Sequence, residues 1–86
     1  MSIKKYVNKL AVNIVNKRGS GDSNITDDVE YYLLDNPRIF KLIDTIGCDF
    51  EKLVRNKIDF LYKVGYNLVP WYKKYLKEIG RLNEKN

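Results

Sequence analysis

The 86-residue sequence predicts an all-α fold, a small single-domain bundle of four to five helices with orthogonal packing. Apolar residues recur at spacings of three and four along most of the chain, which is the period of an amphipathic helix. No segment alternates between apolar and polar residues for long enough to indicate a strand. Residue types that begin or end helices stand between the apolar stretches. The length suits a single domain, residues 1–86, with one modest core.

The first helix is expected between Ser2, which can cap it, and Gly19, which is suited to end it. Residues 19–24 are expected to form a flexible loop. Thr26 is expected to cap a second helix, because two aspartates follow it near the positive end of the helix dipole. The residues expected to face inward are Ile3, Tyr6, Val7, Leu10, Ala11, Ile14 and Val15 on the first helix, and Val29, Tyr32 and Leu33 on the second.

The pair Asn36-Pro37 predicts the start of a third helix, because proline suits the first helical position and asparagine the cap before it. Gly47 is expected to end this helix, and Asp49 is expected to cap the fourth. The residues expected to be buried are Ile39, Phe40, Leu42, Ile43 and Ile46 on the third helix, and Phe50, Leu53, Val54, Ile58, Leu61 and Val64 on the fourth.

The chain is expected to loosen between Gly65 and Val69, and Pro70 is expected in the first turn of a fifth helix. Gly80 is expected to end that helix and to leave residues 81–86 as a frayed tail. The first, third, fourth and fifth helices are expected to supply the core, with Trp71, Tyr72, Tyr75, Leu76 and Ile79 pointing inward from the fifth.

The sequence contains no histidine and a single cysteine, Cys48. Histidine is the commonest general base and metal ligand, so its absence argues against catalytic triads, zinc sites and acid–base pairs. Cys48 follows Gly47 in an expected turn, and no histidine is present to activate its thiol. We therefore expect a protein that is not an enzyme and has no catalytic residue, metal or cofactor.

The sequence also predicts a cytoplasmic location and no transmembrane segment. No apolar stretch approaches the roughly 20 residues needed to span a bilayer. Residues 1–5 lead into alternating polar and apolar positions, which differ from the continuous apolar core of a signal peptide. A single cysteine cannot form an internal disulfide, which fits a reducing compartment.

The net charge of +5 is distributed in blocks. Residues 1–18 carry five basic and no acidic side chains, whereas residues 19–35 carry five acidic and no basic ones. On the fifth expected helix, basic residues share one side and aromatic residues the other, which suits phosphates or anionic lipid head groups. The candidate anion-binding or nucleic-acid-binding residues are Lys73, Lys74, Lys77 and Arg81.

Residues 39–61, two expected helices separated by Gly47, resemble a helix-turn-helix in outline. The exposed side of the second helix argues against DNA recognition, because Glu51 and Asp59 would be repelled by phosphates. Arg55 and Lys63 alternate with them at spacings of four, a pattern typical of a solvated helix.

Two residues depart from the amphipathic pattern. Val12 is predicted on the polar side of the first helix, so that Val12→Asp would change stability by less than about 0.5 kcal/mol. Lys57 is predicted among apolar residues of the fourth helix, where it must extend to solvent, pair with a carboxylate or lie at an interface. An apolar surface that a partner completes would explain both. The candidate partner-binding residues are Val12, Lys57, Lys5 and Lys9.

These patterns lead to one main hypothesis. The chain is expected to be a non-catalytic, basic, helical binding protein that acts as an inhibitor or adaptor on another protein. The alternative is a regulatory protein that binds nucleic acid through a basic helical face, and attachment to a membrane surface is third. The sequence leaves the partner's identity open, and self-association into a homo-oligomer is left open with it.

Overall fold

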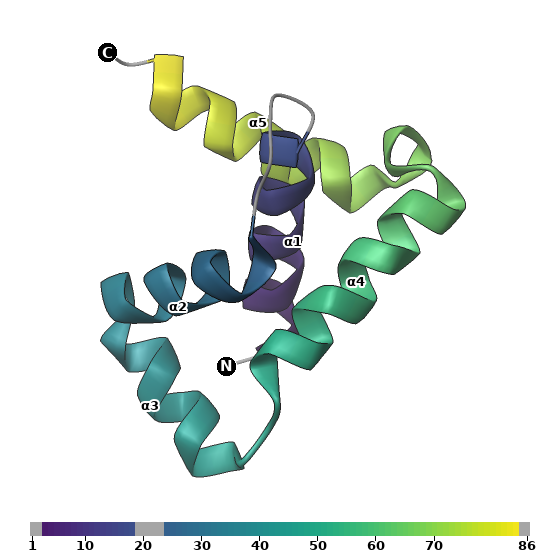
Figure 1. The fold of residues 1–86 in the computed structure, drawn as a ribbon. Coiled ribbons are helices and arrows are strands. Elements are labelled where there is room, and N and C mark those ends of the chain that lie inside the picture. Colours follow the sequence, from purple (N-terminus) through teal and green to yellow (C-terminus); the bar gives the residue numbers. More distant parts are fainter. Residues whose placement is uncertain (1–2, 19–23, 85–86) are drawn as a thin grey trace.

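The computed structural model describes the backbone of residues 3–18 and 24–84 and the side chains of residues 3–17 and 24–78. This part of the chain is helical throughout, apart from short connections (Figure 1). The predicted all-α bundle is therefore confirmed. The elements in order are α1 (Ile3–Arg18), α2 (Ile25–Asp35), α3 (Pro37–Ile46), α4 (Phe50–Val64), the short 3₁₀ helix η1 (Tyr66–Leu68) and α5 (Pro70–Glu84).

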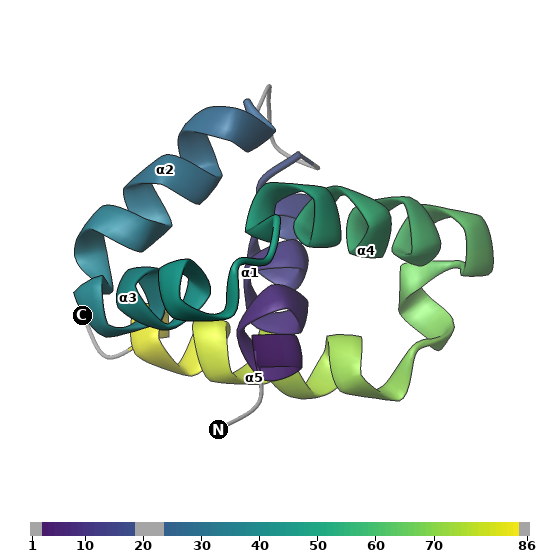
Figure 2. The ribbon, with the colours of Figure 1, turned by 90° about the horizontal axis from the view of Figure 1, so that it is seen from below.

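Helix α1 is the centre of the bundle and packs against α2, α4 and α5. Both ribbon views show α2 and most of α4 on either side of α1, with α5 crossing it at a steep angle (Figures 1 and 2). Nearly every side chain in the middle of α1 is therefore buried, and none of these residues is charged. The buried apolar residues of α1 are Val7, Leu10, Ala11, Val12, Ile14 and Val15.

The predicted exposure of Val12 is wrong, because its side chain is 0% exposed. The prediction assumed that α1 has one apolar side and one solvated side, whereas α1 has neighbours on several sides. A sequence signal for this burial exists: residues 10–16 contain no charged side chain, and a helix that is apolar nearly all round is a core helix. Val12 is thus part of the core and not part of a surface.

Several predicted helix boundaries are confirmed. Pro37 opens α3, and Gly47 ends it with a φ of 75°, a left-handed conformation that glycine adopts without strain. The carboxylate of Asp49 accepts a hydrogen bond from the backbone N–H of Lys52 at 3.1 Å and so caps α4. Gly65 ends α4 with a φ of 99°.

The predicted cap of α2 is wrong by two residues. Asn24 is the cap, because its Oδ1 accepts a hydrogen bond from the backbone N–H of Asp27 at 3.3 Å. The helix therefore begins at Ile25 and buries that side chain in the core. Thr26 lies in the first turn of α2, where its hydroxyl contacts α4 instead of its own helix. The predicted cap Ser2 and residues 19–23 of the predicted loop lie outside the described residues.

The predicted burial of α3 is too extensive. Helix α3 packs chiefly against α2 and contributes only Ile39 and Ile43 to the buried core, whereas Phe40 and Ile46 are more than half exposed. Helix α2, which the sequence does not predict as part of the main core, contributes Ile25 and Val29. On α4, Leu53 and Val64 are likewise more exposed than predicted.

Helix α5 does not end at Gly80 but continues to Glu84, so residues 81–84 are helical where a frayed tail is predicted. A glycine inside a helix costs only about 1 kcal/mol relative to alanine, and no proline follows it here. The N-terminal half of α5 contributes Tyr72 and Tyr75 to the core.

Candidate binding groove

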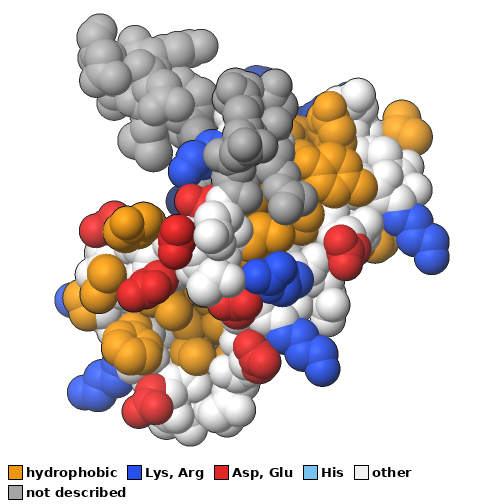
Figure 3. Space-filling model, in the orientation of Figure 1, with side chains coloured by type: hydrophobic (Ala, Val, Ile, Leu, Met, Phe, Trp, Pro, Cys, Tyr) orange, Lys and Arg blue, Asp and Glu red, His pale blue; other side chains and the backbone are white. Residues whose placement is uncertain are grey.

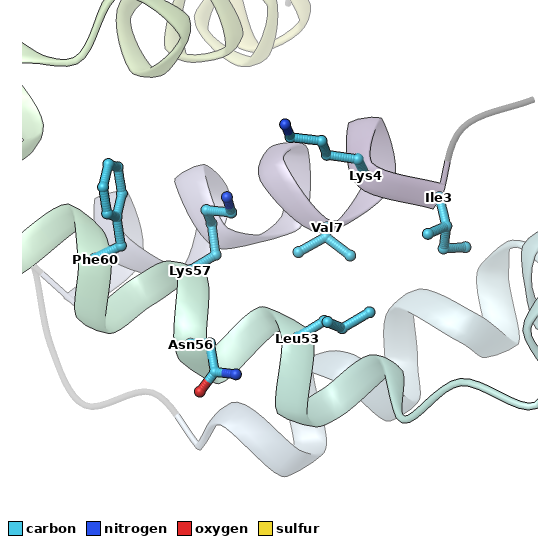
Figure 4. A pocket seen from close by; sticks show the side chains of 7 residues that line it. All are labelled: Ile3, Lys4, Val7, Leu53, Asn56, Lys57 and Phe60. Atoms are coloured by element: carbon cyan, nitrogen blue, oxygen red, sulfur yellow. The ribbon is translucent and has the colours of Figure 1, made fainter.

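A groove of about 350 Å³ lies between the first turns of α1 and the middle of α4. Helix α1 contributes Ile3, Lys4 and Val7, and α4 contributes Leu53, Asn56, Lys57 and Phe60 (Figure 4).

The groove follows from two adjacent rows of residues on α4. One row, which includes Val54, Ile58 and Leu61, is buried in the core. The neighbouring row, Leu53, Lys57 and Phe60, repeats at spacings of four and three and stays accessible along the edge of the α1–α4 contact. This second row forms the α4 wall of the groove.

The apolar walls are accessible to a ligand. Leu53 is 38% exposed and Phe60 is 44% exposed, while Val7 is buried beneath them. Helix-binding grooves in other proteins present apolar walls of this kind to the side chains of a partner. The groove therefore offers a surface on which apolar groups can be buried.

Lys57 extends over two aromatic rings and forms no ion pair with a carboxylate in the described part of the chain. Its Nζ lies 5.5 Å from the centre of the Phe60 ring and 5.6 Å from the centre of the Trp71 ring. These two rings stack with their centres 6.4 Å apart and an angle of 12° between their planes. Such cation–π contacts stabilise an ammonium group at the edge of an apolar surface. The sequence leaves three alternatives for Lys57: extension to solvent, pairing with a carboxylate, or a place at an interface. The structure places Lys57 at the accessible edge of the core.

The charged part of the groove is entirely basic. Among the described residues, Lys4 and Lys57 are the only charged ones that line it, and this described lining contains no carboxylate. Figure 4 shows the side chains of Lys4, Lys57 and Phe60 extending to the same side of the groove, whereas Asn56 points away. The site therefore combines apolar walls with two ammonium groups, which suits an apolar ligand that carries negative charge beside it.

The structure brings together only part of the predicted partner-binding set. Lys57 lines the groove, whereas Val12 is in the core and Lys5 and Lys9 lie on α1 without lining it. Lys4 is a groove residue that the sequence-based prediction misses, since that prediction names only Lys5 and Lys9 among the lysines near the start of this helix. Its position one turn before the inward residue Val7 is the signal that could have found it.

The predicted anion-binding residues form a second basic surface. Lys73, Lys74 and Lys77 are exposed on α5, and the structure gives none of them an ion pair with a described carboxylate. The Nζ of Lys74 lies 5.8 Å from the centre of the Tyr75 ring. The side chain of Arg81 lies outside the described residues. Three of the four predicted residues therefore share one exposed side of α5.

A second cavity, of about 420 Å³, is lined by Tyr6, Ile39 and the residues from 35 to 38 around the turn between α2 and α3. Its charged lining residues are Asp35 and Arg38, so it favours neither sign of ligand charge.

The described residues contain no group of three or more acidic, cysteine or histidine side chains that could hold a metal ion. Within the same part of the chain, no helix has the length and apolar character to cross a membrane. Comparison of the sequence with protein-family models and with curated proteins, and comparison with solved structures, finds no match for this chain.

Proposed function

We propose that this chain is a non-catalytic binding protein, an inhibitor or adaptor, that binds another protein through the α1–α4 groove. The observation that carries the proposal is the composition of the groove, in which accessible Leu53 and Phe60 lie beside Lys4 and Lys57 and no described lining residue is a carboxylate. Burial of these apolar side chains supplies affinity, and the two ammonium groups select a partner with acidic residues beside its apolar ones.

The shape of the groove supports a protein partner over a small molecule. The groove is partly open to solvent and lined from two helices, so that it can accept side chains from one face of a partner helix. Small-molecule sites in proteins usually enclose most of their ligand.

Affinity capture from cells of the source organism tests this function. The wild-type chain is compared with Lys57→Glu, which reverses a charge inside the groove, and with the matched control Lys63→Glu, an exposed lysine on α4 outside it. We expect the wild type and the control to retain the same protein after nuclease treatment, and Lys57→Glu to lose it. Equal retention by all three chains would contradict the proposal.

The second candidate function is binding of nucleic acid through α5. The observation that favours it is the exposed set of Lys73, Lys74 and Lys77 on one side of that helix, none of which pairs with a carboxylate of the described side chains. Each phosphate contact changes the slope of log K against log salt by roughly 0.7–0.9. A mobility-shift assay with a mixed-sequence duplex tests this candidate. The triple reversal of these lysines to glutamate should abolish binding, and an unchanged shift would remove the candidate.

A further inference from the structure

Helix α2 carries an exposed surface whose chemistry is complementary to the groove. Tyr31 and Leu34 are each 66% exposed and lie three residues apart, so they share one face of the helix. The acidic side chains beside them on this face, Asp27, Glu30 and Asp35, are also exposed. Figure 3 shows acidic and apolar side chains gathered over α2.

This acidic face, defined as Asp27, Glu30, Tyr31, Leu34 and Asp35, is available to a partner. The structure gives none of its three carboxylates an ion pair with a described residue. The opposite side of α2 carries Ile25 and Val29, which are buried in the core. Asp27, Glu30, Tyr31 and Leu34 therefore lie on the side of α2 away from the core, and Asp35 lines the second cavity beside Tyr6 of α1.

We propose that the groove of one molecule binds the acidic face of α2 of a second copy, so that the chain self-associates head to tail. The inference rests on the proposed function, because it uses the same groove and names one occupant for it. Apolar Tyr31 and Leu34 meet the walls formed by Leu53 and Phe60, and the carboxylates meet Lys4 and Lys57. The two surfaces of one chain thus match in both charge and apolar pattern.

The geometry makes the contact heterologous. The groove and the acidic face are different surfaces, and a molecule cannot place its own α2 in its own groove while Ile25 and Val29 remain in the core. Each contact therefore leaves one free groove and one free acidic face, so that copies add in an open series or close into a ring. Seven described residues line the groove, whereas a stable interface uses about 20–30 residues on each side, so self-association is weak and depends on concentration.

Sedimentation velocity of the purified full chain tests the inference. The average mass of the wild type should rise with protein concentration, and added salt should reduce the rise because it screens the charge pairs. Lys4→Glu reverses a charge in the groove, and Leu34→Asp removes an apolar residue from the acidic face. Both residues are exposed, so both variants should fold. Each variant alone should remain monomeric at all concentrations.

The decisive sample is an equimolar mixture of Lys4→Glu and Leu34→Asp. The first variant retains an intact acidic face and the second an intact groove, so the mixture should form dimers and nothing larger. A wild-type chain that stays monomeric at its highest soluble concentration would overturn the inference, as would a mixture that stays monomeric while the wild type associates. If the purified chain is monomeric but Lys57→Glu still abolishes capture of a different protein, self-association fails and the proposed function stands.

Discussion

The ammonium group of Lys57 on α4 lies 5.6 Å from the centre of the Trp71 ring on α5. The contact joins the groove to a second helix, because Lys57 lines the groove and Trp71 stacks on Phe60, another lining residue. It also explains how a lysine can occupy a position among apolar residues although no described carboxylate pairs with it.

The first prediction concerns the energy of this contact. In a double-mutant cycle of Lys57→Met and Trp71→Leu, we expect a coupling energy of about 0.5–1 kcal/mol, the range of partly exposed cation–π pairs. Urea denaturation of the four proteins provides the measurement. A control cycle of Lys63→Met with Trp71→Leu, which changes a lysine outside the groove, should give no coupling energy. Zero coupling in the Lys57 cycle would show that the contact does not stabilise the fold.

The second prediction concerns Val12. Because its side chain is fully buried, Val12→Ala should destabilise the chain by about 2 kcal/mol through lost contacts and a cavity. Val12→Asp should prevent folding, because it places an unpaired carboxylate in the core. Thermal melting followed by circular dichroism measures both. A Val12→Asp variant that melts like the wild type would mean that Val12 faces solvent, as the sequence pattern alone predicts.

The third prediction concerns the link between α2 and α4. The Thr26 hydroxyl accepts a hydrogen bond from Arg55 Nη2 at 2.9 Å and donates one to Glu51 Oε2 at 3.4 Å. Arg55 Nε also pairs with Glu51 Oε2 at 3.0 Å. We expect Thr26→Val to destabilise the chain by about 0.5–1 kcal/mol, since the group is exposed.

Thr45→Val is the matched control for this measurement. Among the described residues, the Thr45 hydroxyl donates a hydrogen bond only to the carbonyl of Lys41, one turn earlier in its own helix, and such bonds add little to stability. If Thr26→Val and Thr45→Val lower the free energy of unfolding by the same amount, the hydrogen bonds of Thr26 to α4 do not stabilise the fold.

The fourth prediction concerns alkaline pH. Burial, followed by the charges of Tyr66 and Tyr62, raises the pKa of Tyr72, and burial followed by Tyr6 raises that of Tyr32. A raised tyrosine pKa in the folded state means that the unfolded chain ionises first. The contribution of each neutral, buried tyrosine to the free energy of unfolding is complete below about pH 10, the ordinary tyrosine pKa. It is lost as the pH rises through the pKa of the folded state.

Tyr72→Phe separates this effect from general alkaline unfolding. The variant should lose less free energy of unfolding than the wild type between neutral pH and pH values above 10. Urea denaturation at a series of pH values measures the difference. Identical pH profiles for the two proteins would mean that ionisation of Tyr72 does not contribute.

Local signals account for what the sequence predicts correctly. Pro37, Gly47 and Asp49 act through their own backbone conformation or through a residue three positions away, so their roles can be predicted without knowledge of the packing. Predictions that depend on neighbouring elements were less accurate. The burial of Val12 and the exposure of Phe40 follow from how many helices surround α1 and α3, which one-sided helical periodicity does not report.

The groove could not be predicted either, because it forms only where two helices pack together. Lys57 can be singled out in the sequence because it interrupts an apolar row. Nothing in the sequence indicates that Lys4, on a helix far away along the chain, lines the same groove. The packing of α1 on α4 brings the two together. Trp71, which the sequence predicts as a core residue, is half-buried and supports Lys57 from α5.

The central claim is that another protein occupies the α1–α4 groove, and a photo-crosslinker placed at position 60 tests it most directly. Replacement of Phe60 by benzoylphenylalanine keeps the phenyl ring, and the same group at Leu68, which is 77% exposed and outside the groove, is the control. On irradiation in cells, we predict a protein adduct from position 60 that disappears when Lys57→Glu is added, and no such adduct from position 68. The absence of an adduct from position 60, or an adduct that persists with Lys57→Glu, would contradict the claim.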